Sequence, residues 1–117
     1  SINGGYGVSD RWLQQRPDQI KKMIAVAFRG MAQARAQRQD SIGLIMAKWK
    51  LEHDVAEKAF EMMIKTWTET GVSSDAALQA GIEESLKISN SKQSVALSRV
   101  ADFTLAREVY RELQSRK

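Results

Sequence analysis

Apolar residues recur every three or four positions along most of the chain, the spacing that places side chains on one face of an α-helix. The clearest stripe begins after Pro17, which suits the first position of a helix because no backbone N–H partner is lost there. Its apolar positions are Ile20, Met23, Ile24, Ala27, Phe28, Met31 and Ala34. No proline interrupts the stripe before Asp40, so the pattern predicts one long helix from Pro17 toward that residue.

A shorter stripe follows directly. Asp40 and Ser41 are N-cap candidates, because their side-chain oxygens can accept a free first-turn amide. The apolar positions after them are Ile42, Ile45, Met46 and Trp49. This spacing predicts a short helix that ends near Lys50, followed by a turn over 51–54.

The next stripe is again helical in its spacing. Asp54 and Glu57 are three residues apart, the spacing of a capping box in which aspartate replaces the usual serine or threonine. The apolar positions are Ala56, Ala59, Phe60, Met63, Ile64 and Trp67. We expect this helix to end at Gly71, since glycine suits the left-handed position after a helix.

The last part of the chain predicts two more helices. Ser73 or Ser74 opens the first, and Asp102 caps the second. Their apolar positions are Leu78, Ile82 and Leu86 in the first helix and Leu105, Val109 and Leu113 in the second. Residues 89–94 form a polar loop by composition, and 98–101 are expected to form a single turn.

The first eight residues differ from the rest because they hold three of the seven glycines. They predict either a flexible leader or a short extended segment. Ser9 or Asp10 then caps a short helix that runs to Gln15. We therefore expect a mainly α fold over 1–117, a single domain with five or six helices over 9–117 and at most one short N-terminal strand over 1–8.

Composition excludes several classes of protein. Hydrophobic residues make up 43% and charged residues 27% of the chain, too apolar for a disordered segment. No uncharged run approaches the ~20 apolar residues that span a bilayer, so direct membrane insertion is not expected. The chain has no cysteine, which excludes disulfides, thiolate metal sites and cysteine nucleophiles.

Charge is unevenly distributed along the chain. Residues 1–50 carry a net charge of +6, whereas 51–117 carry −2. A basic half is compatible with a nucleic acid or an acidic membrane as partner. However, Arg29, Arg35 and Arg38 are spread over ten residues without an aromatic stacking platform. We interpret them as a solvated helix face and expect no nucleic-acid partner.

The sequence offers little catalytic chemistry. His53 is the one histidine, and it lies between two carboxylates in a predicted turn, where a capping or surface role is the common one. The segment Gly4–Gly7 is too short for a phosphate-binding loop. Glu83 and Glu84 are adjacent, so on a helix they point about 100° apart and cannot face each other. We expect no catalytic residue, no metal and no cofactor, and therefore no enzyme.

The aromatic and methionine side chains allow two interpretations. The aromatic residues form either a ligand cage or packing surface, and the methionines either fill a core or line a soft binding groove. Packing is favoured because Phe28, Trp49, Phe60 and Trp67 lie on the apolar stripes, which places them in a core or an interface.

The order of several motifs resembles a known family. These motifs are Gly7–Leu13, Arg16–Asp18, Phe28–Gly30, Thr70–Gln79 and Val100–Leu105. In order and separation they are similar to the last third of periplasmic substrate-binding proteins of ABC transporters. The subgroup is the nitrate, sulfonate, taurine and thiamine-pyrimidine-precursor type, with the type II periplasmic-binding-protein fold. The resemblance covers essentially all 117 residues.

The resemblance implies a fragment of a two-lobed α/β protein that closes around a small anion. Residues 2–8 would be a strand returning to the first lobe, and the helices would cover the sheet of that lobe. Tyr6 and Ser9, near the end of that strand, are the candidate ligand-binding residues. In a full-length protein the partner is an ABC permease, and the location is periplasmic or extracytoplasmic.

Without a sheet, the apolar helix faces need another cover. We therefore expect the isolated chain to form a homo-oligomer through these faces. The main functional hypothesis is a supporting part of a solute-binding protein for a small anion of the sulfonate, nitrate or pyrimidine class. The first alternative is a stand-alone helical interaction or oligomerisation module from a truncated gene. A third is thiamine-pyrimidine synthesis with a sacrificial histidine, which some relatives perform, but His53 lies at no matching motif.

Overall fold

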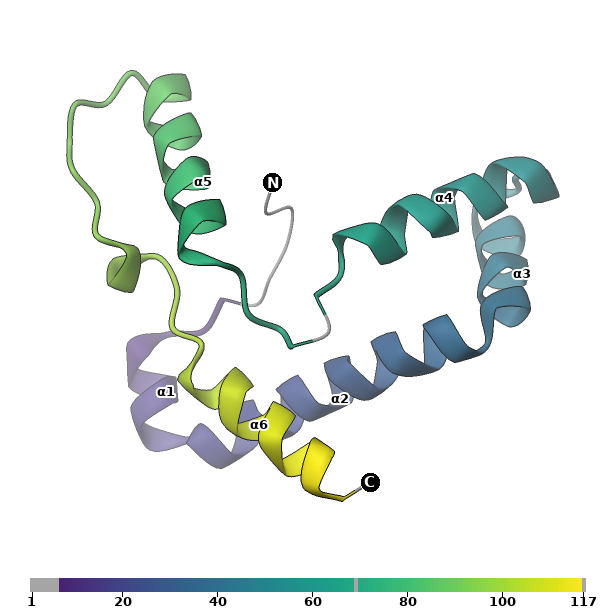
Figure 1. Cartoon of the computed structure of the whole chain (residues 1–117), viewed down its shortest axis with the longest axis horizontal. Helices are drawn as coiled ribbons and strands as arrows, with labels where there is room; N and C mark the ends of the chain where they lie inside the picture. Colours follow the sequence, from purple (N-terminus) through teal and green to yellow (C-terminus); the bar gives the residue numbers. More distant parts are fainter. Residues whose placement is uncertain (1–6, 69, 117) are drawn as a thin grey trace.

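The computed structural model describes residues 7–68 and 70–116. Within these ranges the chain forms six α-helices and one 3-10 helix, with no strand, which confirms a mainly α fold (Figure 1). The elements are α1 (Asp10–Gln15), α2 (Pro17–Ala36), α3 (Arg38–Trp49), α4 (His53–Thr66), α5 (Asp75–Ile88), η1 (Leu97–Arg99) and α6 (Thr104–Ser115). The predicted extended segment over 1–8 lies largely outside the described residues, and its last two residues have no regular structure.

The local signals at the start of the chain act as expected. The Ser9 hydroxyl accepts a hydrogen bond from the Trp12 amide at 3.1 Å and so caps α1. Pro17 is the first residue of α2, where its missing N–H costs no intrahelical bond. Arg16 alone separates the two helices, so α1 turns directly into α2.

Helices α3 and α4 form a helical hairpin with its own core. Ile42 and Ile45 of α3 face Ala56 and Phe60 of α4, and Phe60 keeps only 1% of its surface exposed. Lys50 links the helices in the left-handed conformation, with φ at 54°. The two stripes predicted from sequence therefore cover each other.

Helix α6 lies across the first half of α2 (Figure 1). The residues buried in this part of the molecule are Ile20, Ala106 and Val109. Lys21 of α2 adds ion pairs with Glu112 at 2.6 Å and Glu108 at 3.4 Å. Helix α6 is strongly amphipathic, so one face packs on α2 and the other faces solvent.

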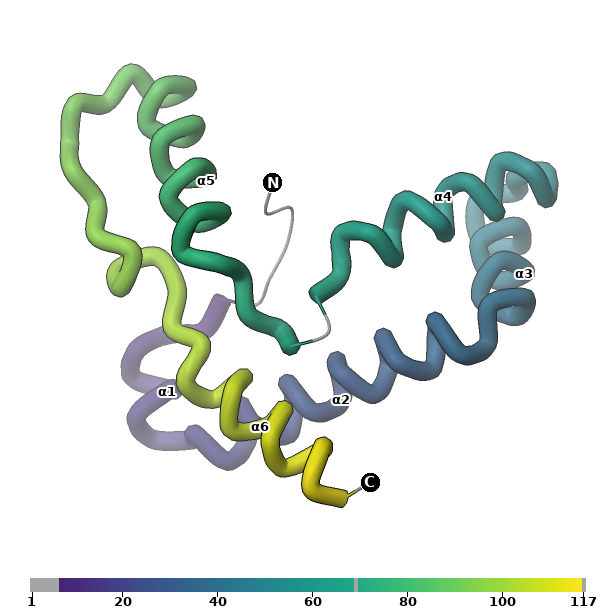
Figure 2. Tube along the Cα trace, in the orientation of Figure 1, coloured from purple at the N-terminus to yellow at the C-terminus, as the bar shows by residue number. Residues whose placement is uncertain are grey.

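Helix α5 stands apart from the other long helices. The chain leaves it at Ser89 and returns along it to η1, as the tube in Figure 2 shows. This return segment (residues 89–101) is mostly without regular structure. Leu78 and Ile82 of α5 are buried, but Ile88 at its end is 80% exposed.

The helices are spread apart and do not pack into one compact body. The Cα radius of gyration is 17.0 Å, whereas a compact chain of this length has about 13 Å. Figure 1 shows the cause: α4 and α5 diverge from the middle of the molecule, while α6 packs along α2 and α1 and α3 contact α2 near its two ends. The molecule measures 45 × 40 × 22 Å.

Four predicted helix boundaries are wrong. Helix α3 begins at Arg38 rather than after Asp40 or Ser41, and α4 begins at His53, one residue before Asp54. Helix α4 also ends at Thr66, well before Gly71. Helix α6 begins after Phe103 rather than directly after Asp102. Tertiary contacts accompany two of these differences, the ion pair of Arg38 at the start of α3 and the hydrogen bonds of Arg35 at the end of α4.

Gly71 does have the left-handed conformation expected of it, with φ at 71°, but it serves a different purpose. A Cβ atom at this position would overlap the ring of Phe28 in α2 and lie 3.8 Å from Ala106 in α6. Glycine is therefore needed because the segment after α4 packs closely where α2 meets α6.

Candidate functional site

The two ligand-binding residues suggested by the family resemblance are only partly described. Tyr6 lies outside the described residues. Ser9 is exposed, and its hydroxyl oxygen is engaged as the N-cap of α1. Within the described residues, Ser9 lines neither of the two best-formed hollows. The ligand contact at Tyr6 and Ser9 therefore stays a prediction.

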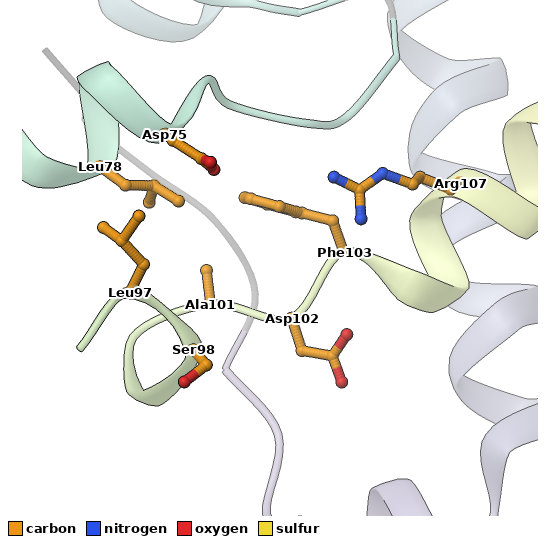
Figure 3. Close-up of a pocket in the computed structure, with 8 residues that line it drawn as sticks. All are labelled: Asp75, Leu78, Leu97, Ser98, Ala101, Asp102, Phe103 and Arg107. Atoms are coloured by element: carbon orange, nitrogen blue, oxygen red, sulfur yellow. The ribbon is translucent and has the colours of Figure 1, made fainter.

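The best-formed hollow lies at the base of α5, where the return segment meets α6 (Figure 3). It encloses about 320 Å³, near the lower limit for small-molecule sites. Leu78, Leu97 and Phe103 point into it in Figure 3, while Asp75 and Arg107 lie at its edge. The hollow is shallow and opens broadly to solvent.

Two of the charged groups around this hollow, Asp102 and Arg107, have local partners. Asp102 accepts hydrogen bonds from the hydroxyl of Thr104 at 2.6 Å and from its amide at 2.9 Å. These bonds, helped by the charge of Arg107, lower the pKa of Asp102 below its ordinary value. The Arg107 guanidinium lies 6.0 Å from the centre of the Phe103 ring. The arrangement shapes the start of α6 and provides no nucleophile–base pair.

Two of the basic residues interpreted as a solvated face have structural roles instead. Arg35 donates hydrogen bonds to the carbonyl oxygens of Ile64 at 3.3 Å and Trp67 at 3.0 Å. Arg38 forms ion pairs with Glu61 at 2.6 Å and Glu57 at 3.5 Å, and the hydrogen bond to Glu61 raises the pKa of Arg38. The solvated-face interpretation is therefore wrong for both side chains.

The position of Arg35 in the sequence could have indicated that its side chain contacts another element. It follows Phe28 by seven residues and Met31 by four, so it continues the apolar stripe of α2 rather than the polar face. A charged residue on such a stripe indicates a partner on the neighbouring element. The partners are main-chain carbonyls, which leave no trace in a side-chain pattern.

His53 has no site around it. Its Nδ1 atom lies 3.8 Å from the carboxylate of Asp54, and both side chains are largely exposed. Within 7–68 and 70–116, no three histidine, cysteine or acidic side chains lie close enough together to hold a metal ion. In the same ranges no helix is long and apolar enough to cross a bilayer.

The aromatic residues divide between interior and surface. Phe60 is buried in the hairpin, whereas Phe28 and Trp67 are half-buried beside Gly71 and Arg35. Trp49 is 57% exposed, with the Lys48 ammonium 5.1 Å from the ring centre. The expected packing role thus holds within the chain for Phe60, while Trp49 is left on the surface.

Large apolar side chains are exposed on most of the helices. They are Met23 and Val26 of α2, Leu44 and Trp49 of α3, Val55, Met62 and Met63 of α4, Ile88 of α5, and Val100 beyond η1. On α4, Val55 and Met62 are seven residues apart and so share the side opposite the hairpin core.

Comparisons with protein-family models, curated proteins and solved structures found no match for this chain.

Proposed function

We propose that this chain is a supporting part of one lobe of an extracytoplasmic solute-binding protein, which delivers a small anion of the sulfonate, nitrate or pyrimidine class to an ABC importer. In this role the helices cover a sheet supplied by the rest of the lobe. The chain does not bind the ligand by itself. The ABC permease is then a partner of the whole protein.

The open arrangement of the helices is the observation that supports this proposal. A chain that buries its own apolar faces approaches the compact radius of about 13 Å, and this chain has 17.0 Å. Leu44 and Met62, both 71% exposed, lie on separate helices and do not cover each other. Helices that are apolar on more than one side are typical of elements packed between two layers.

The test compares the isolated chain with the product of its complete reading frame. Thermal unfolding of both is followed with taurine, alkanesulfonates, nitrate and pyrimidines. A ligand that binds the folded state raises the melting temperature by mass action. We expect one of these ligands to raise the melting temperature of the complete product and none to affect the isolated chain. A reading frame with no further lobe, or no response of its product to any of these ligands, contradicts the proposal.

The exposed apolar side chains also favour a second candidate, a helical module that assembles with further copies of itself. Contiguous exposed apolar surface commonly marks an interface. Light scattering of the isolated chain at increasing concentration distinguishes the two. A stable homo-oligomer whose formation is abolished by Met62→Glu but not by Arg111→Glu, at an exposed position of α6, supports this candidate. A monomer at all concentrations argues against it.

A further inference from the structure

The α3–α4 hairpin has the properties of a rigid body within the larger chain. Its core consists of residues from its own two helices, with Met46, Leu51 and Ile64 packed around it. The ion pairs of Arg38 with Glu57 and Glu61 also join α3 to α4. None of these contacts requires α2, α5 or α6.

The hairpin joins α2 through a single non-helical residue, Gln37, with φ at −107° and ψ at 60°. Ser41 spans this joint, since its hydroxyl donates to the carbonyl oxygens of Ala34 at 2.9 Å and Gln37 at 3.0 Å. A change in two backbone angles at Gln37 would turn the whole hairpin relative to α2. Residues at the ends of helices commonly act as hinges of this kind.

Arg35 of α2, two residues before Gln37, holds the C-terminal end of α4. Carbonyl groups in the last turn of a helix lack intrahelical partners, and the charged guanidinium donates to two carbonyls there, those of Ile64 and Trp67. The carbon centre of the guanidinium also lies 5.8 Å from the centre of the Trp67 ring. Arg35 thus fixes the end of α4 on α2, while Ser41 holds the start of α3 at the joint itself.

We propose that Gln37 is a hinge and Arg35 is its latch, so that release of Arg35 lets the α3–α4 hairpin rotate away from α2 as a rigid body. The rotation is bounded, because the chain returns to α2 at Gly71, which packs against Phe28. The hairpin core stays intact during the motion. This conformational device does not depend on the proposed function.

The experiment uses the absence of cysteine, which allows two spin labels to be placed without a background signal. Gln19→Cys on α2 and Leu44→Cys on α3 are both exposed positions. We expect a single narrow distance distribution in the labelled parent. With Arg35→Ala the distribution broadens or gains a second population, while amide hydrogen exchange of Phe60 and Ile45 stays as slow as in the parent. Arg35→Lys, which keeps the charge but loses the planar fork, gives an intermediate result.

Arg29→Ala is the matched control, because Arg29 is an exposed arginine on the same helix. It should leave the distance distribution unchanged. The proposal is overturned if Arg35→Ala leaves the distribution unchanged, or if Arg29→Ala has the same effect. It is also overturned if Arg35→Ala removes the exchange protection of the hairpin, since hairpin and α2 would then form one cooperative unit.

Discussion

The α3–α4 hairpin and α5 with its return segment begin from similar sequence patterns and reach different degrees of burial. Each starts with a helix that has an apolar stripe, and in each the chain then turns back. In the hairpin the returning chain is a second amphipathic helix, and Phe60 is almost fully buried. Beside α5 the returning chain is largely polar and irregular, and Ile88 stays 80% exposed.

The difference shows that an amphipathic helix determines what must be covered but not what covers it. Fixing a residue in an irregular segment costs conformational entropy of about 1–2 kcal/mol, and such a segment offers few apolar side chains in return. A second helix satisfies its own backbone hydrogen bonds and presents a continuous apolar face. The hairpin is thus closed within the chain, whereas α5 keeps the apolar side chain at its end exposed.

The largest effect is expected when one apolar side chain is truncated in each region and the free energies of unfolding are compared. Phe60→Ala should lower the free energy of unfolding by about 3–5 kcal/mol, because it leaves a cavity in the hairpin core. Ile88→Ala, at an exposed position, should change it by less than about 0.5 kcal/mol. Urea unfolding followed by circular dichroism measures both. Equal effects of the two substitutions would remove the contrast.

The second test concerns glycine in the segment that joins the two regions. Gly71→Ala forces a Cβ into the ring of Phe28 at a positive φ and should destabilise the chain by about 3 kcal/mol. Gly81→Ala, inside α5 with open space around it, should instead stabilise by about 0.5–1 kcal/mol. Thermal melts should show a lower melting temperature for Gly71→Ala and a higher one for Gly81→Ala. A higher melting temperature for Gly71→Ala would show that the segment does not pack on α2.

A third, smaller effect is expected at the start of α5. The Ser74 hydroxyl accepts a hydrogen bond from the amide of Ala77 at 3.1 Å, so Ser74→Ala should cost about 1 kcal/mol. Because α5 packs mainly on η1, amide exchange within α5 should accelerate while that of Phe60 is unaffected. The control, Ser85→Ala inside α5, removes no cap and should not accelerate exchange, because alanine is a better helix former than serine. Faster exchange in both regions would show that they unfold together.

The smallest effect is a difference in acid sensitivity between two helix starts. The pKa of Asp102 is lowered by its bonds from Thr104, so the stability it contributes is present above its ordinary pKa of 3.8. That stability is lost as the pH falls through the lowered value, because the protonated carboxyl accepts hydrogen bonds poorly. The cap of α5 is the hydroxyl of Ser74, which does not titrate in this range. Exchange of the Thr104 amide, corrected for intrinsic rates, should therefore accelerate in acid more than that of Ala77, and Asp102→Asn should remove this difference.

Short-range signals predicted several helix starts correctly. Ser9, Pro17 and Ser74 begin their helices as expected, because a cap depends only on residues within one turn. Asp102 misses the predicted cap position by one residue, because Phe103 is the N-cap of α6, although the Asp102 carboxylate still accepts a hydrogen bond from the Thr104 amide. The polar loop over 89–94 lies outside the helices, as its composition predicted, and the single turn expected over 98–101 is found one residue earlier, as η1 (Leu97–Arg99).

Long-range contacts explain the predictions that failed. Asp40 has a good capping side chain, yet α3 starts earlier, at Arg38, whose guanidinium reaches Glu61 on α4. Helix α4 ends at Thr66 where Arg35 binds the carbonyl of Trp67. The local sequence pattern of either helix does not predict how close α2 and α4 lie to each other. The ligand contact at Tyr6 and Ser9 depended on a family resemblance and stays a prediction.

The amino-acid sequence by itself determined that this chain is mainly helical, where most of its helices lie and which side of each is apolar, because periodicity and caps act over a few residues. The tertiary structure decided which of those sides are paired. It closed α3 on α4, placed Arg35 and Gly71 at the junctions, and left apolar side chains of α4 and α5 exposed. Pairing depends on the direction in which each connection sends the next helix, and that direction is set by contacts between residues far apart in the chain.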